Sequence, residues 1–245
     1  MSSRLSVFGF FSAVLSLADC ASGGATAPSG ARPEEGLGDA VEENIARVSC
    51  SSANTTPAPT SGVIADFSAK QDGKRGADDI PAKLISSVPR GAVPGATMTS
   101  STQDGTLTIN VKAALGAKPQ IFSTSLFFDR CVDASGFAGI EFSISGSLSG
   151  CSLTYASVDP EHQFYRAGGP YPPQTRISQD DVKSQPKKIV APFRGSEIAG
   201  SPPTPADPSK LAFIQWLVIA PVAADDGSAP PCAGSIVIDD VKLYR

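Results

Sequence analysis

Short apolar segments, separated by clusters of glycine, proline and aspartate, follow one another from about residue 62 to residue 245. The clearest is 106–111, where apolar and polar residues alternate as they do in a strand with one buried face. Repeated short strands with turn signals between them are typical of a β-sandwich or barrel. Further strands are predicted at 63–67, 96–100, 120–128, 138–145, 152–158, 188–193, 211–219 and 235–244. We therefore predict an all-β domain at 62–245, a jelly-roll β-sandwich of two antiparallel sheets.

The segment 211–219 differs from the other predicted strands because both of its faces are apolar. One face carries Ile214, Trp216 and Val218, and the other carries Phe213, Leu217 and Ile219. A strand with two dry faces needs a cover on each side. Two interpretations remain open: a central strand whose outer face lies under a loop, or an outer face that serves as a platform for a ligand.

Size and charge narrow the classes of partner. A domain of roughly 180 residues buries most of the surface of its unfolded chain and can fold without a metal or a partner, so we expect a monomer. The formal net charge is -4. An acidic balance argues against binding to nucleic acid or to an anionic membrane surface.

The first twenty residues follow the plan of an export signal, with Arg4 as the positive charge and a predominantly apolar stretch at 5–18. That stretch is too short to span a bilayer. It ends in Leu-Ala-Asp-Cys at 17–20, which resembles the lipobox of bacterial lipoproteins, although Asp19 departs from the small residue expected there. We predict an exported protein, either a lipoprotein anchored through Cys20 at the outer membrane or cell surface, or a protein secreted after cleavage nearby. A misassigned start without export is the third alternative.

Residues 21–61 are rich in Ser, Gly, Ala, Pro and Thr, and we predict a disordered linker there. Within this linker, four apolar residues fall at helical spacing and indicate a short, marginal helix. They are Leu37, Val41, Ile45 and Val48. The predicted organisation is therefore an export signal at 1–20, a linker at 21–61 and one sandwich domain at 62–245.

Four cysteines remain when Cys20 is set aside, namely Cys50, Cys131, Cys151 and Cys232. An even number in an oxidising compartment predicts two disulfides. Cys131 and Cys151 bracket a hairpin-like stretch, so we pair them with each other and Cys50 with Cys232. The alternative is that Cys50 is free in the linker. The chain has no Cys-x-x-Cys and a single histidine, so no Cys/His zinc site is expected.

Five segments of the domain carry a family resemblance. They are Val-Ile-Ala-Asp-Phe at 63–67, the strand-like stretch 137–146, Lys-Ile-Val-Ala-Pro-Phe at 188–193, the stretch 207–216, and Ile-Val-Ile-Asp-Asp-Val-Lys-Leu-Tyr at 236–244. In this order they resemble galactose-binding-domain-like carbohydrate-binding modules of bacterial polysaccharide-degrading and cell-surface proteins. The resemblance covers residues 62–245 and implies a β-sandwich that binds carbohydrate.

Many modules of this kind hold a structural calcium, in part through an acidic residue after the opening Asp-Phe, and here that position is Ser68. Asp66, Asp239 and Asp240 still offer hard oxygen ligands from the first and last strands. Because adjacent residues of a strand point to opposite faces, at most one of Asp239 and Asp240 faces a given site. The alternative is that these are solvated aspartates at strand ends. No other cofactor is predicted.

Residues that would suit a hydrolase are few. A Ser-His-Asp arrangement would have to use His162, and the chain has no Gly-x-Ser-x-Gly motif. A glycosidase needs two carboxylates roughly 5 to 10 Å apart. Asp159 with Glu161, or Glu141 with a facing acid, are the candidates, but no pattern distinguishes them from surface acids. We predict that the protein is not an enzyme and keep a β-sandwich glycan-active enzyme as an alternative.

The segment 162–171 concentrates aromatic and planar hydrogen-bonding side chains in a chain with only 7% aromatic residues. Proteins bind sugars by stacking aromatic faces on C–H groups and by hydrogen bonds from planar polar side chains. The predicted glycan-binding residues are Gln163, Tyr165, Arg166 and Tyr171, together with the outer residues of 211–219. The alternative is a long loop that is pinned by its own aromatic side chains.

These observations favour a non-catalytic glycan-binding module of an exported or lipid-anchored bacterial protein. Its partner would be a carbohydrate or a cell-surface glycan, and it would reach the membrane only through a lipid on Cys20. The main alternative is a structural or adhesive envelope protein that binds other proteins.

Overall fold

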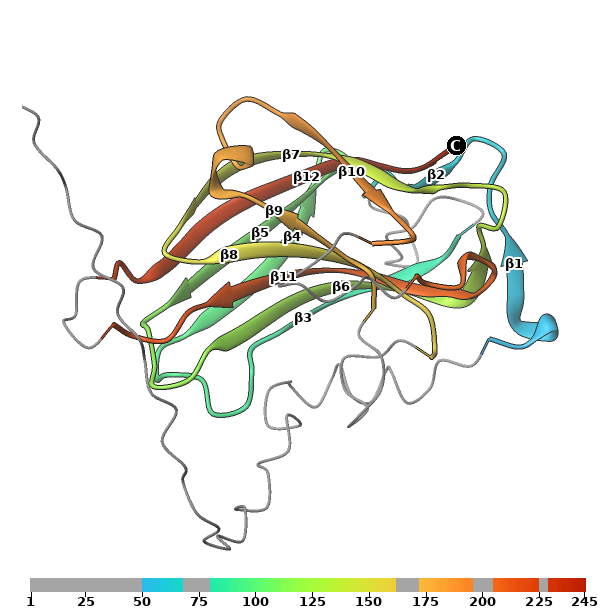
Figure 1. The fold of residues 1–245 in the computed structure, drawn as a ribbon. Helices are drawn as coiled ribbons and strands as arrows, with labels where there is room; N and C mark the ends of the chain where they lie inside the picture. Colours follow the sequence, from blue (N-terminus) through green and yellow to red (C-terminus); the bar gives the residue numbers. More distant parts are fainter. Residues whose placement is uncertain (1–49, 68–79, 162–171, 196–204, 225–228) are drawn as a thin grey trace, which may run out of the picture. The chain divides into compact units, whose positions relative to one another are not determined.

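The computed structural model describes residues 50–67, 80–161, 172–195, 205–224 and 229–245, all within the compact unit 32–245. Twelve strands in these residues form two sheets that pack face to face (Figure 1). The described helices are short 3₁₀ turns, η2 (Ser52–Asn54), η3 (Gln179–Asp181) and η4 (Pro208–Lys210). Within the described ranges, no helix is long and apolar enough to cross a membrane.

Sheet A contains six strands. They are β1 (Thr55–Pro57), β3 (Ala82–Ser87), β6 (Gln120–Asp133), β8 (Ser152–Val158), β9 (Gln174–Ile177) and β11 (Leu211–Ala220). Their order is β1–β6–β11–β8–β9, and β3 pairs with β6 next to β1. The β1–β6 pair is parallel, whereas the other pairs of this sheet are antiparallel.

Sheet B also contains six strands. They are β2 (Val63–Ala65), β4 (Thr97–Gln103), β5 (Thr106–Ala113), β7 (Gly139–Ser149), β10 (Lys187–Pro192) and β12 (Cys232–Tyr244). The order is β10–β7–β12–β5–β4, with β2 paired to the last residues of β12. The edge strands β3 of sheet A and β4 of sheet B are linked by a hydrogen bond of 2.7 Å, which the Ser86 hydroxyl donates to the Ser100 hydroxyl.

The predicted β-sandwich is confirmed by these two sheets. Each strand expected from the sequence has a counterpart, but β1, β3 and β9 were not predicted. These three lie at the edges of sheet A, where a strand needs only one partner and its sequence is less constrained. The prediction that all pairs are antiparallel is wrong for β1, which pairs in parallel with β6. The two strands are far apart in the chain and are not joined by a hairpin.

The β4–β5 hairpin fixes the register of one half of sheet B. Its turn is Asp104-Gly105, with φ angles of 51° and 80°. Two central residues at positive φ match a type I′ turn, whose twist suits the flanking strands. Thr99 therefore pairs with Asn110, and Ser101 pairs with Thr108. These four polar residues share the face of sheet B that points away from sheet A.

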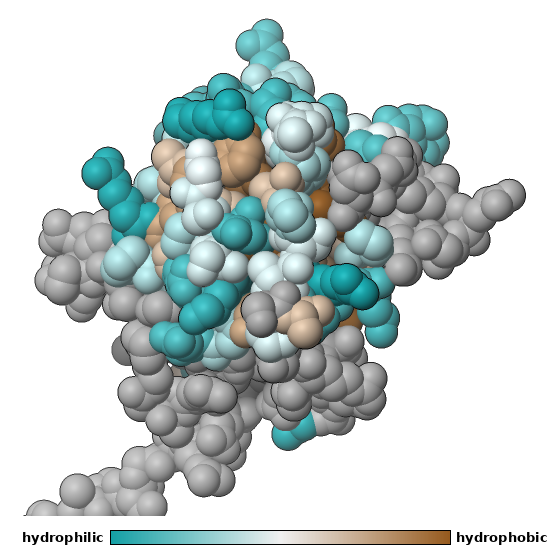
Figure 2. All heavy atoms as spheres, turned by 90° about the vertical axis from the view of Figure 1, so that its right-hand side faces the viewer, coloured by the Kyte–Doolittle hydropathy of each residue, from teal (hydrophilic) through white to brown (hydrophobic). Residues whose placement is uncertain are grey.

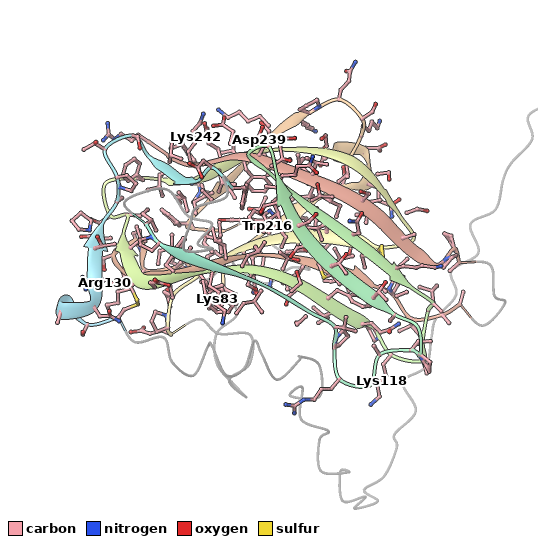
Figure 3. All side chains as sticks on the ribbon, turned by 180° about the vertical axis from the view of Figure 1, so that it is seen from behind. Lys83, Lys118, Arg130, Trp216, Asp239 and Lys242 are labelled. Carbon is pink, nitrogen blue, oxygen red and sulfur yellow. A yellow bond between two sulfur atoms is a disulfide. The ribbon has the colours of Figure 1, made fainter. Side chains whose placement is uncertain are left out.

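Aromatic side chains from both sheets meet in the centre of the core. Trp216 on β11 lies between the two layers (Figure 3) and is fully buried. Its ring centroid is 5.8 Å from that of Phe142 on β7, edge to face, and 5.9 Å from that of Tyr155 on β8. Such pairs contribute roughly 0.5 to 1.5 kcal/mol each beyond the burial of their area. This cluster holds sheet A against sheet B.

The face of sheet A that points away from sheet B carries a second hydrophobic cluster. Its members are Ile85, Phe127, Cys131, Ala156, Val158, Ala212 and Phe213. The rings of Phe127 and Phe213 are 4.5 Å apart between centroids. Strand β11 is thus buried along both faces, as its sequence predicted.

The structure corrects the predicted disulfide pairing. The bonds join Cys50 to Cys131 and Cys151 to Cys232. Cys131 and Cys151 do not bracket a hairpin, because the strand between them, β7, belongs to sheet B, whereas β6 and β8 lie in sheet A. Strands β6 and β8 both run antiparallel to β11, so Cys131 at the end of β6 and Cys151 at the start of β8 lie at opposite ends of the sheet.

The sandwich includes residues before position 62, which was predicted to be the first residue of the domain. Cys50 is tied to β6, and β1 at Thr55–Pro57 extends sheet A. The amide of Ala58 also donates a hydrogen bond of 2.9 Å to the carbonyl of Asp133. Residues 50–61 therefore belong to the sandwich. The remainder of the predicted linker and the predicted export signal lie outside the described residues.

Removing the Cys151–Cys232 disulfide should destabilise the domain strongly. The two cysteines are 81 positions apart. A loop of that length gives about 4.5 kcal/mol in the loop-entropy model, and native disulfides typically contribute 2 to 5 kcal/mol. We expect the Cys151→Ser/Cys232→Ser variant to lose about 3 to 4 kcal/mol of unfolding free energy in urea titrations. Cys20→Ser serves as the control, and a loss below 1 kcal/mol in the double variant would contradict the pairing.

Candidate functional site

The outer face of sheet B is rich in small polar side chains. Hydroxyl and amide groups alternate with the inward core residues along β4, β5, β7 and β12, so they form cross-strand rows. One row runs Thr99, Asn110, Ser235 and Ser147, and the next runs Ser101, Thr108, Val237 and Ser145. We call this surface the hydroxyl face. It presents many hydrogen-bonding groups on a rigid backbone.

A groove crosses one end of the hydroxyl face, where β12 begins. It has a volume of about 880 Å³ and lies over the ends of β5, β7 and β12, with Pro94 and Gly95 at its rim. Its polar side chains are Asn110, Lys112, Ser147, Ser149 and Ser235. Its apolar lining residues include Pro94, Pro231 and Ala233. The groove thus combines hydrogen-bond donors and acceptors with apolar surface.

The other end of the hydroxyl face carries a cluster of charges. Glu141 lies between two lysines, with 2.6 Å from its carboxylate to Lys188 Nζ and 3.7 Å to Lys242 Nζ. Lys242 also donates a hydrogen bond of 2.8 Å to Asp240, and this contact raises the pKa of the lysine. Glu141 is therefore paired with two cations. The glycosidase interpretation required a second carboxylate opposite Glu141 instead.

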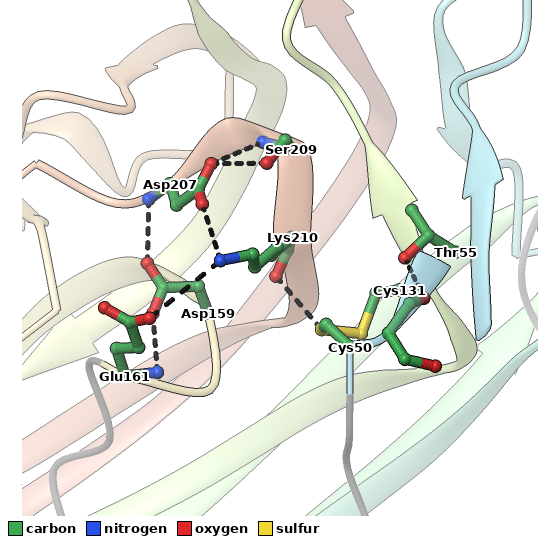
Figure 4. Close-up of polar contacts among 9 residues, drawn as sticks. Cys50, Thr55, Cys131, Asp159, Glu161, Asp207, Ser209 and Lys210 are labelled. Carbon is green, nitrogen blue, oxygen red and sulfur yellow. Dashed lines mark hydrogen bonds and ion pairs between the residues drawn. A yellow bond between two sulfur atoms is a disulfide. The ribbon is translucent and has the colours of Figure 1, made fainter. Parts of the chain in front are cut away.

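A second polar cluster lies near the Cys50–Cys131 disulfide (Figure 4), at the end of the domain away from the groove. Asp159 is 1% exposed and accepts hydrogen bonds from the backbone amides of Glu161, at 2.8 Å, and Asp207, at 2.7 Å. Asp207 in turn caps η4 by accepting from the Ser209 amide at 3.0 Å, and forms an ion pair of 3.2 Å with Lys210. Both oxygens of Asp159 bind backbone amides, so this carboxylate joins two segments of the chain.

The predicted glycan-binding residues Gln163, Tyr165, Arg166 and Tyr171 lie outside the described residues. The segment 162–171 directly follows Glu161 in the sequence. The groove lies beside Cys232, which is bonded to Cys151 just before β8.

The groove itself was not predicted. The polar positions of the 106–111 alternation were its only signal, and that pattern was assigned to a solvated face.

Described aromatic rings contribute little to the surface. Those of Trp216, Tyr155 and Phe213 are buried, while Phe137 and Tyr244 are half-buried. Phe137 is covered by the Arg245 guanidinium, 5.0 Å above the ring. Figure 2 looks at the end of the domain that carries β1, β2 and the C-terminus, where hydrophilic side chains surround smaller hydrophobic areas. Within the described ranges, no fully exposed aromatic platform is present.

The three predicted calcium ligands lie on two paired segments, Asp66 after β2 and Asp239 and Asp240 on β12. Asp239 faces outward opposite Ser143 on β7, and a bulge follows in which Asp240 adopts a φ of 54° and pairs with Lys242. Asp66 directly follows β2. No group of three or more His, Cys, Asp or Glu side chains within the described ranges has a geometry that could hold a metal ion.

The sequence matches no protein-family model and no curated protein. Solved structures similar to this chain include a family 11 carbohydrate-binding module of a cellulosomal cellulase from Clostridium thermocellum, with 16% identity and a TM-score of 0.43. That similarity covers 74% of this chain and 92% of the module. An agarase (11% identity, TM-score 0.41) and an exo-β-agarase (12%, 0.39) are also similar over 75% of this chain, which spans 24% of each of them.

The Asp207 cluster should make stability depend on pH in the acid range. Hydrogen bonds from Ser209 and the neighbouring Lys210 hold the pKa of the Asp207 carboxyl below its ordinary value of 3.8. A carboxyl with a lowered folded-state pKa stabilises the fold above its unfolded pKa, and this contribution is lost as the pH falls through the folded pKa. We expect Asp207→Asn to reduce the unfolding free energy by about 0.5 to 1 kcal/mol at pH 7, a small value because the side chain is partly exposed. In urea titrations the difference should shrink as the pH falls below the ordinary carboxyl pKa of 3.8, and a difference that is independent of pH would contradict this assignment.

Proposed function

We propose that this protein is a non-catalytic glycan-binding module of an exported protein, and that the glycan binds in the groove of the hydroxyl face. The observation that carries the proposal is the groove of about 880 Å³, lined by hydroxyl, amide and ammonium groups beside apolar surface. Ligand sites commonly combine a concave apolar surface with a few convergent polar groups. A sugar ring offers hydroxyls around its rim and C–H groups on its faces, which match these two kinds of lining.

The strands that line the groove favour binding without rearrangement. Asn110, Ser147 and Ser235 lie on paired strands, so their backbones are already ordered before a ligand arrives. Binding energy is then not spent on ordering a loop. Each hydrogen bond to a sugar hydroxyl replaces one to water and contributes only about 0.5 to 1.5 kcal/mol. We therefore expect modest, micromolar or weaker affinity.

The described carboxylates support a binding role rather than a hydrolytic one. Asp159 binds two backbone amides, and Glu141 is paired with Lys188 and Lys242. The sequence resemblance to carbohydrate-binding modules supports the same ligand class. The residues Gln163, Tyr165, Arg166 and Tyr171 remain a proposed second contact.

A structural or adhesive role is the second candidate function. The observation that favours it is the hydroxyl face itself, which carries no exposed aromatic ring among the described residues. Sugar rings stack on aromatic faces, so on this surface a glycan would depend on hydrogen bonds and small apolar contacts. Binding to polysaccharide separates the two candidates.

Substitution in the groove should weaken glycan binding. In calorimetry against soluble polysaccharides, we expect Asn110→Ala/Lys112→Ala to lower the affinity about tenfold or more, because two hydrogen-bonding groups are lost, one of them charged. Thr108→Ala, on the same strand outside the groove, and Lys83→Ala, on sheet A, are matched controls that should bind normally. If Tyr165→Ala and Tyr171→Ala abolish binding while the groove variant binds normally, the site is the segment 162–171. If the wild-type domain binds no polysaccharide, the adhesive role is favoured.

Export is tested separately from binding. Mass spectrometry of the native protein should show that at least the first nineteen residues are removed, because the charge at Arg4 and the apolar stretch at 5–18 form an export signal. If Cys20 carries a lipid, Cys20→Ser should release the protein from the membrane fraction. Unchanged fractionation would favour secretion, and an intact Met1 would rule out export.

A further inference from the structure

Side chains on the outer face of sheet A are as buried as core residues, although they point away from sheet B. Along β11, Phe213 and Gln215 are 0% exposed and Leu217 is 3% exposed. On the neighbouring β6, Ser123 and Ser125 are likewise 0% exposed. All of these side chains point away from sheet B. Such burial requires an occupant on this face.

The described residues supply only one edge of that cover. Apart from residues of sheet A itself, the described hydrophobic residue that packs against the cluster of Phe127 and Phe213 is Cys50. Cys50 is held there by its disulfide to Cys131, which belongs to the same cluster. The chain upstream of Cys50 is therefore delivered to this face by a covalent bond.

We propose that residues 37–48 of this chain dock on the outer face of sheet A. A helix of that length measures about 18 Å at 1.5 Å per residue. From Phe213 to Leu217 the face extends about 13 Å along β11, at roughly 3.3 Å per residue. A segment that ends two residues before Cys50 can therefore span the face without a connecting loop.

The residue pattern of 37–48 fits this face. Four apolar residues at helical spacing form one stripe, namely Leu37, Val41, Ile45 and Val48. Asp39, Glu42 and Glu43 supply negative charge outside that stripe. Exposed cations flank the face on both sides, with Lys83 on the edge strand β3 and Arg176 on the edge strand β9. The segment and the face are thus complementary in polarity and in charge.

An unpartnered donor on the face points to the same conclusion. The Gln215 side chain is fully buried, and its Oε1 atom lies 3.4 Å from the Ser125 hydroxyl. Its Nε2 atom is buried with no hydrogen-bond partner among the described residues. A buried donor without an acceptor is costly, so an occupant with acceptors is favoured over a purely apolar one. In the segment, Asn44 borders the apolar stripe at helical spacing, and its side chain has an acceptor oxygen.

Docking can be tested in the full mature chain without removing any residue. We expect hydrogen–deuterium exchange to show amides of 37–48 protected at least tenfold relative to amides of 21–31. A photo-reactive residue at position 41 should cross-link, within one chain, to peptides of β6, β8 or β11, and the same residue at position 46 should not. Because 41 and 46 lie on opposite sides of a helix, they are a matched pair.

Charge substitution gives an independent readout. Val41→Asp/Ile45→Asp should abolish the protection and lower the melting temperature, whereas Ala46→Asp, on the opposite side, should do neither. Absence of protection in the wild-type chain would overturn the proposal even if the double variant fails to fold. Cross-links from position 41 to a second copy of the chain, or to the segment 162–171, would also overturn it.

Discussion

The contact between the two sheets at Trp216 is the interaction on which the rest of the structure depends. Trp216 and Tyr155 come from sheet A and Phe142 from sheet B, so their rings join the layers directly. Burying three such side chains contributes several kcal/mol, at about 1.5 to 3 kcal/mol for each large apolar group. Burial also raises the pKa of the Tyr155 phenol far above its ordinary value, so the group stays protonated and hydrogen-bonded to Ser157. Trp216 Nε1 is buried and has no hydrogen-bond partner among the described residues, a cost that this apolar packing must offset.

Side chains alternate between the two faces of a strand, so the residues between the core positions determine the chemistry of the outer faces. In sheet B many outward positions of β4, β5, β7 and β12 carry polar side chains, so that face tolerates water and forms the hydroxyl face. In sheet A the outward positions of β11 are as buried as the inward ones. The two sheets are therefore not equivalent: one face suits a soluble, hydroxyl-rich ligand, and the other suits a permanent cover. The disulfides reinforce this division, because Cys151–Cys232 links the sheets near the groove and Cys50–Cys131 ties the incoming chain to sheet A.

The sequence predicts local structure here better than it predicts long-range partners. Alternation at 106–111 and the two apolar faces of 211–219 predicted β5 and β11 correctly, because each pattern reflects the burial of a single strand. The Asp104-Gly105 turn likewise sets a hairpin from two residues. Disulfide pairing failed because it depends on which sheet β7 joins, and no residue of the segment between Cys131 and Cys151 encodes that choice. The groove was missed for a similar reason: Asn110, Ser147 and Ser235 come from three strands far apart in sequence and meet only through the register.

The position of the groove on paired strands bears on the kind of recognition it can perform. Rows of hydroxyls at strand spacing order water as well as sugar, and displacing well-ordered water without replacing its hydrogen bonds loses affinity. A glycan in the groove would restore those bonds with its own hydroxyls, whereas an apolar protein surface would not. Among the described residues that line the groove, Lys112 is the one charged side chain, so most of the contact energy must come from neutral hydrogen bonds and from apolar contacts with residues such as Pro94, Pro231 and Ala233. Binding of this kind depends little on salt, which distinguishes it from recognition driven by surface charge.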